Sequence, residues 1–372
     1  TEKIEFVERT EVEMNYDADA GITNTVDLSD VLADGDYTVD SLTVAGKNVN
    51  ATLSGTTLTI TDATRDIGNT VWGEQTMVLT VRDADGALTV VNIPVLVITQ
   101  VIRTPEQLAN WNTLSYAADS EGAYWAGYFV LGDDIDMTGV TYNSAFSYTD
   151  LYEADIVKPE YAPLSFRNGR TGGFRGVFDG RGHVIDNLNM AEWNGSFAGQ
   201  IATAGVVKNI VFTNVTLGGA ASLIAPGGDG RIENVYAHIV SVTAGNGSNH
   251  DKTGTFFGQD TMGEARVVNC FALFEPTPST SVGGDTGFTG LGKYHLGYGI
   301  LNNMYAVGLP TGNGFVTLTT GGGTDGGYGA YATAEEFAAA VTVDADNGWD
   351  MTFWTTDSDG LPIPVTLAAA QA

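Results

Sequence analysis

The pattern apolar–any–Asn–apolar recurs five times in this chain and restricts its fold more than any other feature. The copies are centred on Asn187, Asn209, Asn234, Asn269 and Asn303, and the steps, from 209 − 187 to 303 − 269, are 22, 25, 35 and 34 residues. Steps of this size are typical of solenoids, whose short units bury their apolar faces only by stacking. We therefore expect the five segments to lie rung above rung around one dry core.

The segments between these asparagines favour strands over helices. A β-run such as 210–212 or 235–240 follows each copy, glycine-rich breaks come next, and helical periodicity is missing. This predicts a parallel β-helix, an all-β fold, in place of stacked helix pairs. Asparagine tolerates the left-handed backbone conformation that turns a corner, and stacked amides can hydrogen-bond from one rung to the next.

One stretch of the chain supports this expectation because it resembles a known sequence signature. Residues 174–188 read FRGVFDGRGHVIDNL, locally two short strands around an Asp179-Gly180 turn. The stretch resembles the F-x-G-x-F-D-G-x-G-H-x-I-x-N-L signature of GLUG-type domains, and the likeness runs from about residue 102 to 367. The resemblance implies a right-handed parallel β-helix displayed outside a bacterial cell, often beside immunoglobulin-like modules. It implies no catalytic residue.

The sequence predicts two domains. Residues 1–99 alternate as short strands, with hairpins at 49–60 and 77–93, and predict an immunoglobulin-like β-sandwich. Residues 100–372 are then the β-helix with end caps.

Short capping helices are expected at both ends of the β-helix. Thr104 and Pro105 begin one helix, and its Trp111 is expected to cover the open end, the alternative being a ligand-stacking role. Thr333 begins a second helix. The tail 348–364, which also resembles the close of GLUG-type domains, is expected to plug the last rung, with its prolines stopping further pairing.

Charge and cysteine content exclude several partners. The 372 residues carry 45 acidic and 16 basic side chains, a net charge of −29, which repels nucleic acid and anionic membranes. The same charge disfavours a polyanionic glycan as substrate unless cations intervene. No apolar run has the length of a membrane span. The single cysteine, Cys270, lies in an apolar run and is expected to be a core residue without disulfide or reactive role.

Asp133, Asp134 and Asp136 form the one acidic cluster that invites a chemical role. Three interpretations remain open: a structural turn or cap, a calcium site built from clustered oxygens, and an acid–base pair for glycoside hydrolysis. On a strand Asp134 and Asp136 share one face and Ile135 takes the other. Calcium is the only cofactor that the sequence suggests.

Aromatic residues in the side loops are the candidate ligand contacts, because loops on a rigid scaffold commonly carry recognition. The candidates are Tyr152, Tyr161, Trp193, Tyr294, His295 and Tyr298. The alternative is that these rings pack their own loops onto the solenoid.

The sequence shows no metal-binding histidine cluster, nucleophile elbow, phosphate loop or dinucleotide fingerprint. We therefore expect a monomeric, secreted or bacterial cell-surface, adhesin-like protein that binds a glycan or a host surface protein without catalysis. A β-helix glycoside hydrolase or polysaccharide lyase is the enzymatic alternative, and a ligand-free structural spacer is the third.

Overall fold

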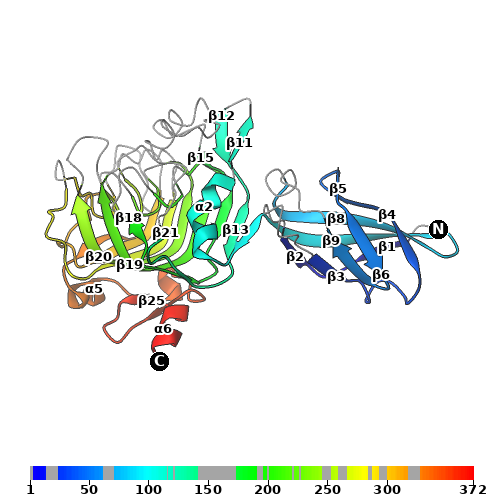
Figure 1. Cartoon of the computed structure of the whole chain (residues 1–372). Helices are drawn as coiled ribbons and strands as arrows, with labels where there is room; N and C mark the ends of the chain where they lie inside the picture. Colours follow the sequence, from blue (N-terminus) through cyan, green and yellow to red (C-terminus); the bar gives the residue numbers. More distant parts are fainter. Residues whose placement is uncertain are drawn as a thin grey trace. The chain divides into compact units, whose positions relative to one another are not determined.

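Figure 1 shows the chain as a computed structural model. The structure describes residues 3–13, 24–61, 71–114, 116–119, 122–140, 173–190, 196–198, 201–219, 222–225, 228–244, 253–258, 266–283, 287–292, 300–316 and 327–372. The chain forms two compact units, Thr1–Val101 with Ala126–Val130 and Ile102–Trp125 with Leu131–Ala372.

The first unit is built on two sheets. The larger sheet has the order β1-β9-β8-β4-β5, with β2 also paired to β9, and the smaller sheet has the order β3-β7-β6. The strands are β1 (Lys3–Phe6), β2 (Thr10–Glu13), β3 (Asn24–Asp27), β4 (Tyr37–Val44), β5 (Lys47–Asn48), β6 (Ala51–Ser54), β7 (Thr57–Ile60), β8 (Gly73–Asp83) and β9 (Leu88–Ile98). β1 and β2 run parallel to β9 and β8 runs antiparallel to it, so the larger sheet is mixed.

Both hairpins expected in this unit are present, as β6–β7 and β8–β9. The first begins at the Ala51↔Ile60 pair and turns at Gly55, whose φ of 57° costs glycine little. Buried side chains from both sheets form one core, with Leu58 from the smaller sheet and Leu79 from the larger. The predicted β-sandwich is therefore confirmed.

The second unit is a β-solenoid, and its strands belong to an eleven-stranded sheet. The order of this sheet is β10-β13-β16-β19-β20-β21-β22-β23, with β14, β17 and β18 alongside. Most residues of β10 and β13 fall within the ranges of the first unit. The strands are β10 (Gln100–Ile102), β13 (Tyr128–Leu131), β14 (Ile135–Asp136), β16 (Val177–Asp179), β17 (Val184–Asp186), β18 (Asn189–Met190), β19 (Val206–Gly219), β20 (Arg231–Ala244), β21 (Arg266–Phe274), β22 (Ile300–Val307) and β23 (Tyr328–Tyr331). From β16 to β23 the successive strands pair in parallel, which confirms the predicted stacking of coils.

A column of apolar side chains in register forms the dry interior. Phe178, Val207, Ile232, Val267 and Leu301 occupy equivalent positions on β16 and β19–β22, and each is at most 1% exposed. Parallel sheets covered on both faces contain nearly continuous apolar runs, which explains the β-runs noted in the sequence. A smaller sheet of β11 (Tyr116–Asp119), β12 (Gly122–Trp125) and β15 (Gly173–Phe174) adjoins this unit's first coils.

The asparagines of the repeat turn corners, and they form two columns where one was expected. All five have a left-handed φ, between 51° and 59°. Asn209, Asn234, Asn269 and Asn303 follow one another in register along β19–β22. Asn187 lies at a different corner, where its neighbour in the next coil is Asn214. The expected single column is thus wrong for one copy, because the same local pattern serves both corners of a coil.

Residues 174–188 also differ from their local appearance. The two expected strands are present as β16 and β17, but both pair with β19 and neither pairs with the other. The Asp179-Gly180 turn, continued by Arg181 at φ 52° and Gly182 at φ 77°, is a solenoid corner. A Cβ on Gly180 would lie 2.4 Å from the carbonyl oxygen of Asn209. Glycine is required here because the next coil approaches so closely.

The first capping helix, α2 (Pro105–Leu114), has the expected cap. The Gln107 backbone N–H donates to the hydroxyl of Thr104 over 3.2 Å. Trp111 is fully buried, and its ring centroid lies 5.2 Å from Phe174, 4.8 Å from Phe178 and 5.5 Å from Phe197. It therefore packs into the core of the first coils, as expected of a lid. No helix in the described ranges has the length and apolarity to cross a membrane.

The C-terminal segment lies along the side of the solenoid, which corrects the expectation of a plug on the last rung. We call residues 332–372 the strap. It contains α5 (Ala334–Ala340), η1 (Ala345–Asn347), β24 (Trp354–Thr356), β25 (Pro362–Pro364) and α6 (Val365–Gln371). The prolines of β25 pair with β24, so they do not end pairing as expected. Aromatic strap residues share one core with the outward side chains of successive rungs, Val211, Tyr236, Phe271 and Tyr305.

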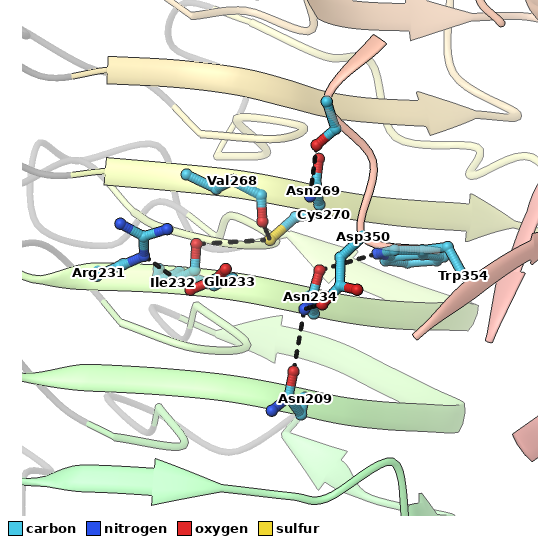
Figure 2. A network of polar contacts seen from close by, with 11 residues as sticks. Asn209, Arg231, Ile232, Glu233, Asn234, Val268, Asn269, Cys270, Asp350 and Trp354 are labelled. Carbon is cyan, nitrogen blue, oxygen red and sulfur yellow. Dashed lines mark hydrogen bonds and ion pairs between the residues drawn. The ribbon is translucent and has the colours of Figure 1, made fainter. Parts of the chain in front are cut away.

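The strap follows the asparagine column from its last rung towards its first. Asn303 donates to the carbonyl of Asn347 over 2.9 Å. Asn269 donates to the carbonyl of Gly348 over 3.1 Å (Figure 2). At the next rung Asn234 Nδ2 donates to Asp350 over 3.0 Å and Asn234 Oδ1 accepts from the Trp354 indole over 3.1 Å. Further along, Thr366 donates to the carbonyl of Gly182 over 2.6 Å. Each strap contact therefore satisfies a corner of a different coil.

Candidate functional site

A hollow of about 560 Å³ opens at the N-terminal ends of β19–β21. We call it the arginine groove, and it is lined by Thr203, Gly205, Asp229, Gly230, Arg231 and Arg266. The volume lies within the range of small-ligand sites, roughly 300–1,000 Å³. The size of the groove therefore suits a small ligand.

A glycine corner forms the floor of this groove. The backbone N–H groups of Val206, Arg231 and Arg266 donate to the carbonyls of Gly176, Gly205 and Gly230, each in the preceding coil. A Cβ on Gly205 would lie 2.1 Å from the carbonyl oxygen of Phe174, and Gly230 is equally confined. The coils approach too closely for a side chain at Gly205 or Gly230, so these two residues line the hollow with main-chain atoms alone.

The two arginines occupy neighbouring rungs in direct register. Arg231 Nε donates to Glu233 over 2.8 Å, which makes a partly exposed ion pair (Figure 2). Arg266 is exposed, and its guanidinium group has no hydrogen bond or ion pair with any residue that the structure describes. Asp229, 8% exposed, is the one carboxylate of the lining. The groove thus presents two cations and one anion on a strongly acidic molecule.

The acidic cluster forms hydrogen bonds that hold the second corner. As expected from alternation, Ile135 is buried while Asp134 and Asp136 are exposed. Asp134 accepts from the backbone N–H of Val184 over 2.9 Å and lies 3.1 Å from the ring of His183. The ring of His183 therefore has a carboxylate partner.

Asp136 accepts from the hydroxyl and backbone N–H of Thr138 and from the Asn187 amide over 2.9 Å. These bonds, with that of Asn187 first, lower the pKa of the Asp136 carboxyl. Within the described ranges no three Asp, Glu, His or Cys side chains gather closely enough to hold a metal ion. The calcium site at Asp133, Asp134 and Asp136 stays a prediction.

A second hollow of about 270 Å³ lies between the strap and the first coils, with Asp179 and Asp350 in its lining. Asp179 accepts from the Asn209 amide over 3.0 Å. Burial opposes ionisation of Asp350, but hydrogen bonds from Thr352 and Asn234 outweigh it and lower the pKa of that carboxyl. A glycosidase acid needs a raised pKa, and the pKa of Asp350 is shifted in the opposite direction.

Cys270 is fully buried, as expected of a core residue (Figure 2). Its thiol lies 3.4 Å from the carbonyl oxygen of Val268, and burial raises the pKa of that thiol far above its ordinary value. A reactive cysteine needs the opposite shift.

The candidate ligand contacts from the loops lie outside the described residues. They are Tyr152, Tyr161, Trp193, Tyr294, His295 and Tyr298. Their distance from the arginine groove is therefore not defined, and their role as ligand contacts stays a prediction.

No family model, curated protein or solved structure matches the chain. The fold is consequently assigned from its own geometry, as a β-solenoid with an all-parallel sheet and an aromatic core, following a β-sandwich.

Sequence reasoning did not find the arginine groove, although a signal for it exists. Arginine comes directly before the repeated pattern in two successive copies, at Arg231 before Ile232 and at Arg266 before Val267. In a solenoid the same position in successive copies stacks, so the pair was predictable once the repeat was aligned from its first apolar residue.

Proposed function

We propose that this chain is a secreted or surface-displayed binding module of bacterial origin, in which a GLUG-type solenoid holds a glycan or host ligand without transforming it. The observation that carries the proposal is the arginine groove. It has the size of a ligand site and offers hydrogen-bond donors, but its lining has a single carboxylate. Glycoside hydrolysis needs two carboxyl groups with distinct roles.

The ionisation of the carboxylates supports the absence of catalysis. Among the described residues, the carboxyl groups with shifted pKa values are Asp27, Glu74, Asp136 and Asp350, and all four are shifted down. Hydrogen bonds within the fold cause these shifts, which is the behaviour of structural groups.

A glycan and host-matrix array, read with the intact chain with and without calcium, tests this proposal. We expect selective retention of a small set of glycans or matrix proteins. Uniform silence on the array would leave only the structural spacer. Release of new reducing or unsaturated ends from any retained polysaccharide would contradict a non-catalytic role and favour the enzymatic alternative.

A further inference from the structure

We propose that the arginine groove binds the carboxylate of an acidic sugar unit, with Arg266 and Arg231 as its two cationic contacts. This inference rests on the proposed binding function and specifies its site and ligand class.

The stacking of the two arginines is the first reason. Neighbouring parallel strands lie roughly 4.8 Å apart, so side chains in direct register meet, and like charges there are unfavourable. Glu233 compensates one of the two through the Nε of Arg231. Arg266 has no such compensation from the described residues. A bound carboxylate would accept hydrogen bonds from both guanidinium groups, whose planar donors suit that geometry.

The size and lining of the groove indicate a sugar in place of a bare anion. At about 560 Å³ the hollow is much larger than an inorganic ion needs. Thr203 supplies a hydroxyl suited to sugar hydroxyl groups, while Val206 adds an apolar surface.

The charge of the whole chain limits how many negative charges the ligand carries. A net charge of −29 repels polyanions. Two arginines on adjacent rungs offset this field only locally. The ligand class is therefore a neutral or weakly charged glycan that carries an isolated acidic sugar.

Calorimetric titration of the intact chain with sodium glucuronate, glucose and sodium sulfate tests the inference. We expect saturable glucuronate binding that weakens with added salt, and no saturation with glucose or sulfate over the same concentrations. Arg266→Gln is expected to weaken glucuronate binding at least about tenfold, the loss of a charge-assisted hydrogen-bonded pair. Arg266→Lys should retain part of the affinity. Arg82→Gln, an exposed arginine of the β-sandwich, is the matched control and should bind as the unmodified chain does.

Three results would overturn the inference: no glucuronate binding, equal binding of glucuronate and sulfate, or unchanged affinity in Arg266→Gln. A groove that binds glucuronate and sulfate equally is a general anion site. If the array described above retains glycans that Arg266→Gln binds equally well, this site assignment fails while the proposed binding function stands. If the array is silent and glucuronate does not bind, both fail.

Discussion

At the scale of single residues, one asparagine per rung combines two roles that no other residue type fills at once. Each adopts a left-handed corner at low cost, and the amide then reaches the next rung. Asn234 donates to Asn209 over 3.0 Å, and Asn303 donates to Asn269 over the same distance. Asp179, which is in register with Lys208, accepts from Asn209. The side-chain ladder therefore has two segments, from β16 to β20 and from β21 to β22, and between them Asn234 and Asn269 bond to the strap.

Substitution of Asn234 separates these two roles. Asn234→Gly keeps the corner but removes the bonds to Asn209, Asp350 and Trp354, and we expect it to lower the free energy of unfolding of the solenoid by about 2–4 kcal/mol. Asn234→Ala should cost a further ~1–2 kcal/mol for the left-handed φ. Urea unfolding measures both. Asn302→Ala, one residue from a ladder position on β22, is the control, and equal losses in the Gly and Ala variants would show that the corner is unstrained.

Asp350 predicts how the solenoid responds to acid. Its pKa is lowered in the folded chain, so its contribution to stability is present above the unfolded value, near 4, and is lost as the pH falls through the folded value. We expect the free energy of unfolding to decrease from about pH 5 downwards, and Asp350→Asn to lessen that dependence. Thermal unfolding between pH 7 and pH 2.5 measures it. An unchanged pH profile in the variant would contradict the role given to this carboxyl.

At the scale of elements, the strap provides the outer layer that a parallel sheet needs on its second face. The interior column covers one face of β19–β22, and the strap covers the other with Phe337, Trp349, Phe353 and Trp354. Without it, Tyr236 and its neighbours in register would meet water. Burial in this layer raises the pKa of Tyr236 to about 12, with Asp357 and Glu275 adding to the shift.

The outer edge of β23, the last strand of the sheet, is partly covered by backbone pairing. β23 pairs with β22 on one side, and on the other Ala330 exchanges two backbone hydrogen bonds with Gly312. A short antiparallel bridge therefore occupies part of the edge to which another chain could add. Backbone pairing at β23 thus protects the last strand of the solenoid, and the buried aromatic ring of α2 covers its first coils.

Trp354 tests the strap as an element. Its ring is fully buried and lies 5.3 Å from Trp349 and 4.9 Å from Phe353. We expect Trp354→Ala to destabilise the solenoid by about 3–5 kcal/mol, and Trp354→Phe, which mainly loses the bond to Asn234, by about 1–2 kcal/mol. Chemical denaturation measures the loss, and hydrogen exchange should report faster opening of β20–β22.

Met351, 39% exposed on the same segment, is the control position, and Met351→Ala should change stability little. Undiminished exchange protection of β20–β22 in Trp354→Ala would mean that the strap is not needed by the sheet.

At the scale of the whole molecule, the chain divides into two units with separate cores. The sandwich core includes Leu79 and the strap-side core of the solenoid includes Trp354, and no described residue belongs to both clusters. Units with separate cores can unfold independently.

Calorimetry should therefore resolve two unfolding transitions. Leu79→Ala is expected to destabilise the sandwich by about 2–5 kcal/mol and lower only its transition, because the side chain is fully buried in that core. The strap variants above should lower only the other. A single transition that both kinds of variant shift together would contradict independent units.

The repeat, the corners and the sandwich could be predicted from the sequence because they depend on local chemistry. Asparagine spacing, apolar β-runs and turn residues act within a few positions, so the stacked strands and the first helix with its Thr104 cap were accessible. The position of Asn187 outside the main column could not be predicted. Two corners of one coil require the same residue types, and only the register of β17 on β19 distinguishes them.

The course of the strap and the arginine groove were decided by the tertiary structure. Aromatic bulk and prolines near the C-terminus suit an end plug and a lateral cover equally, and only contacts between residues more than a hundred positions apart, such as Trp354 with Asn234, choose between them. The groove likewise exists because Arg231 and Arg266, 35 positions apart in the chain, share one register. Local residue types determined which segments become strands and corners, whereas packing determined which of them meet, because contacts between distant segments depend on how all the coils stack together.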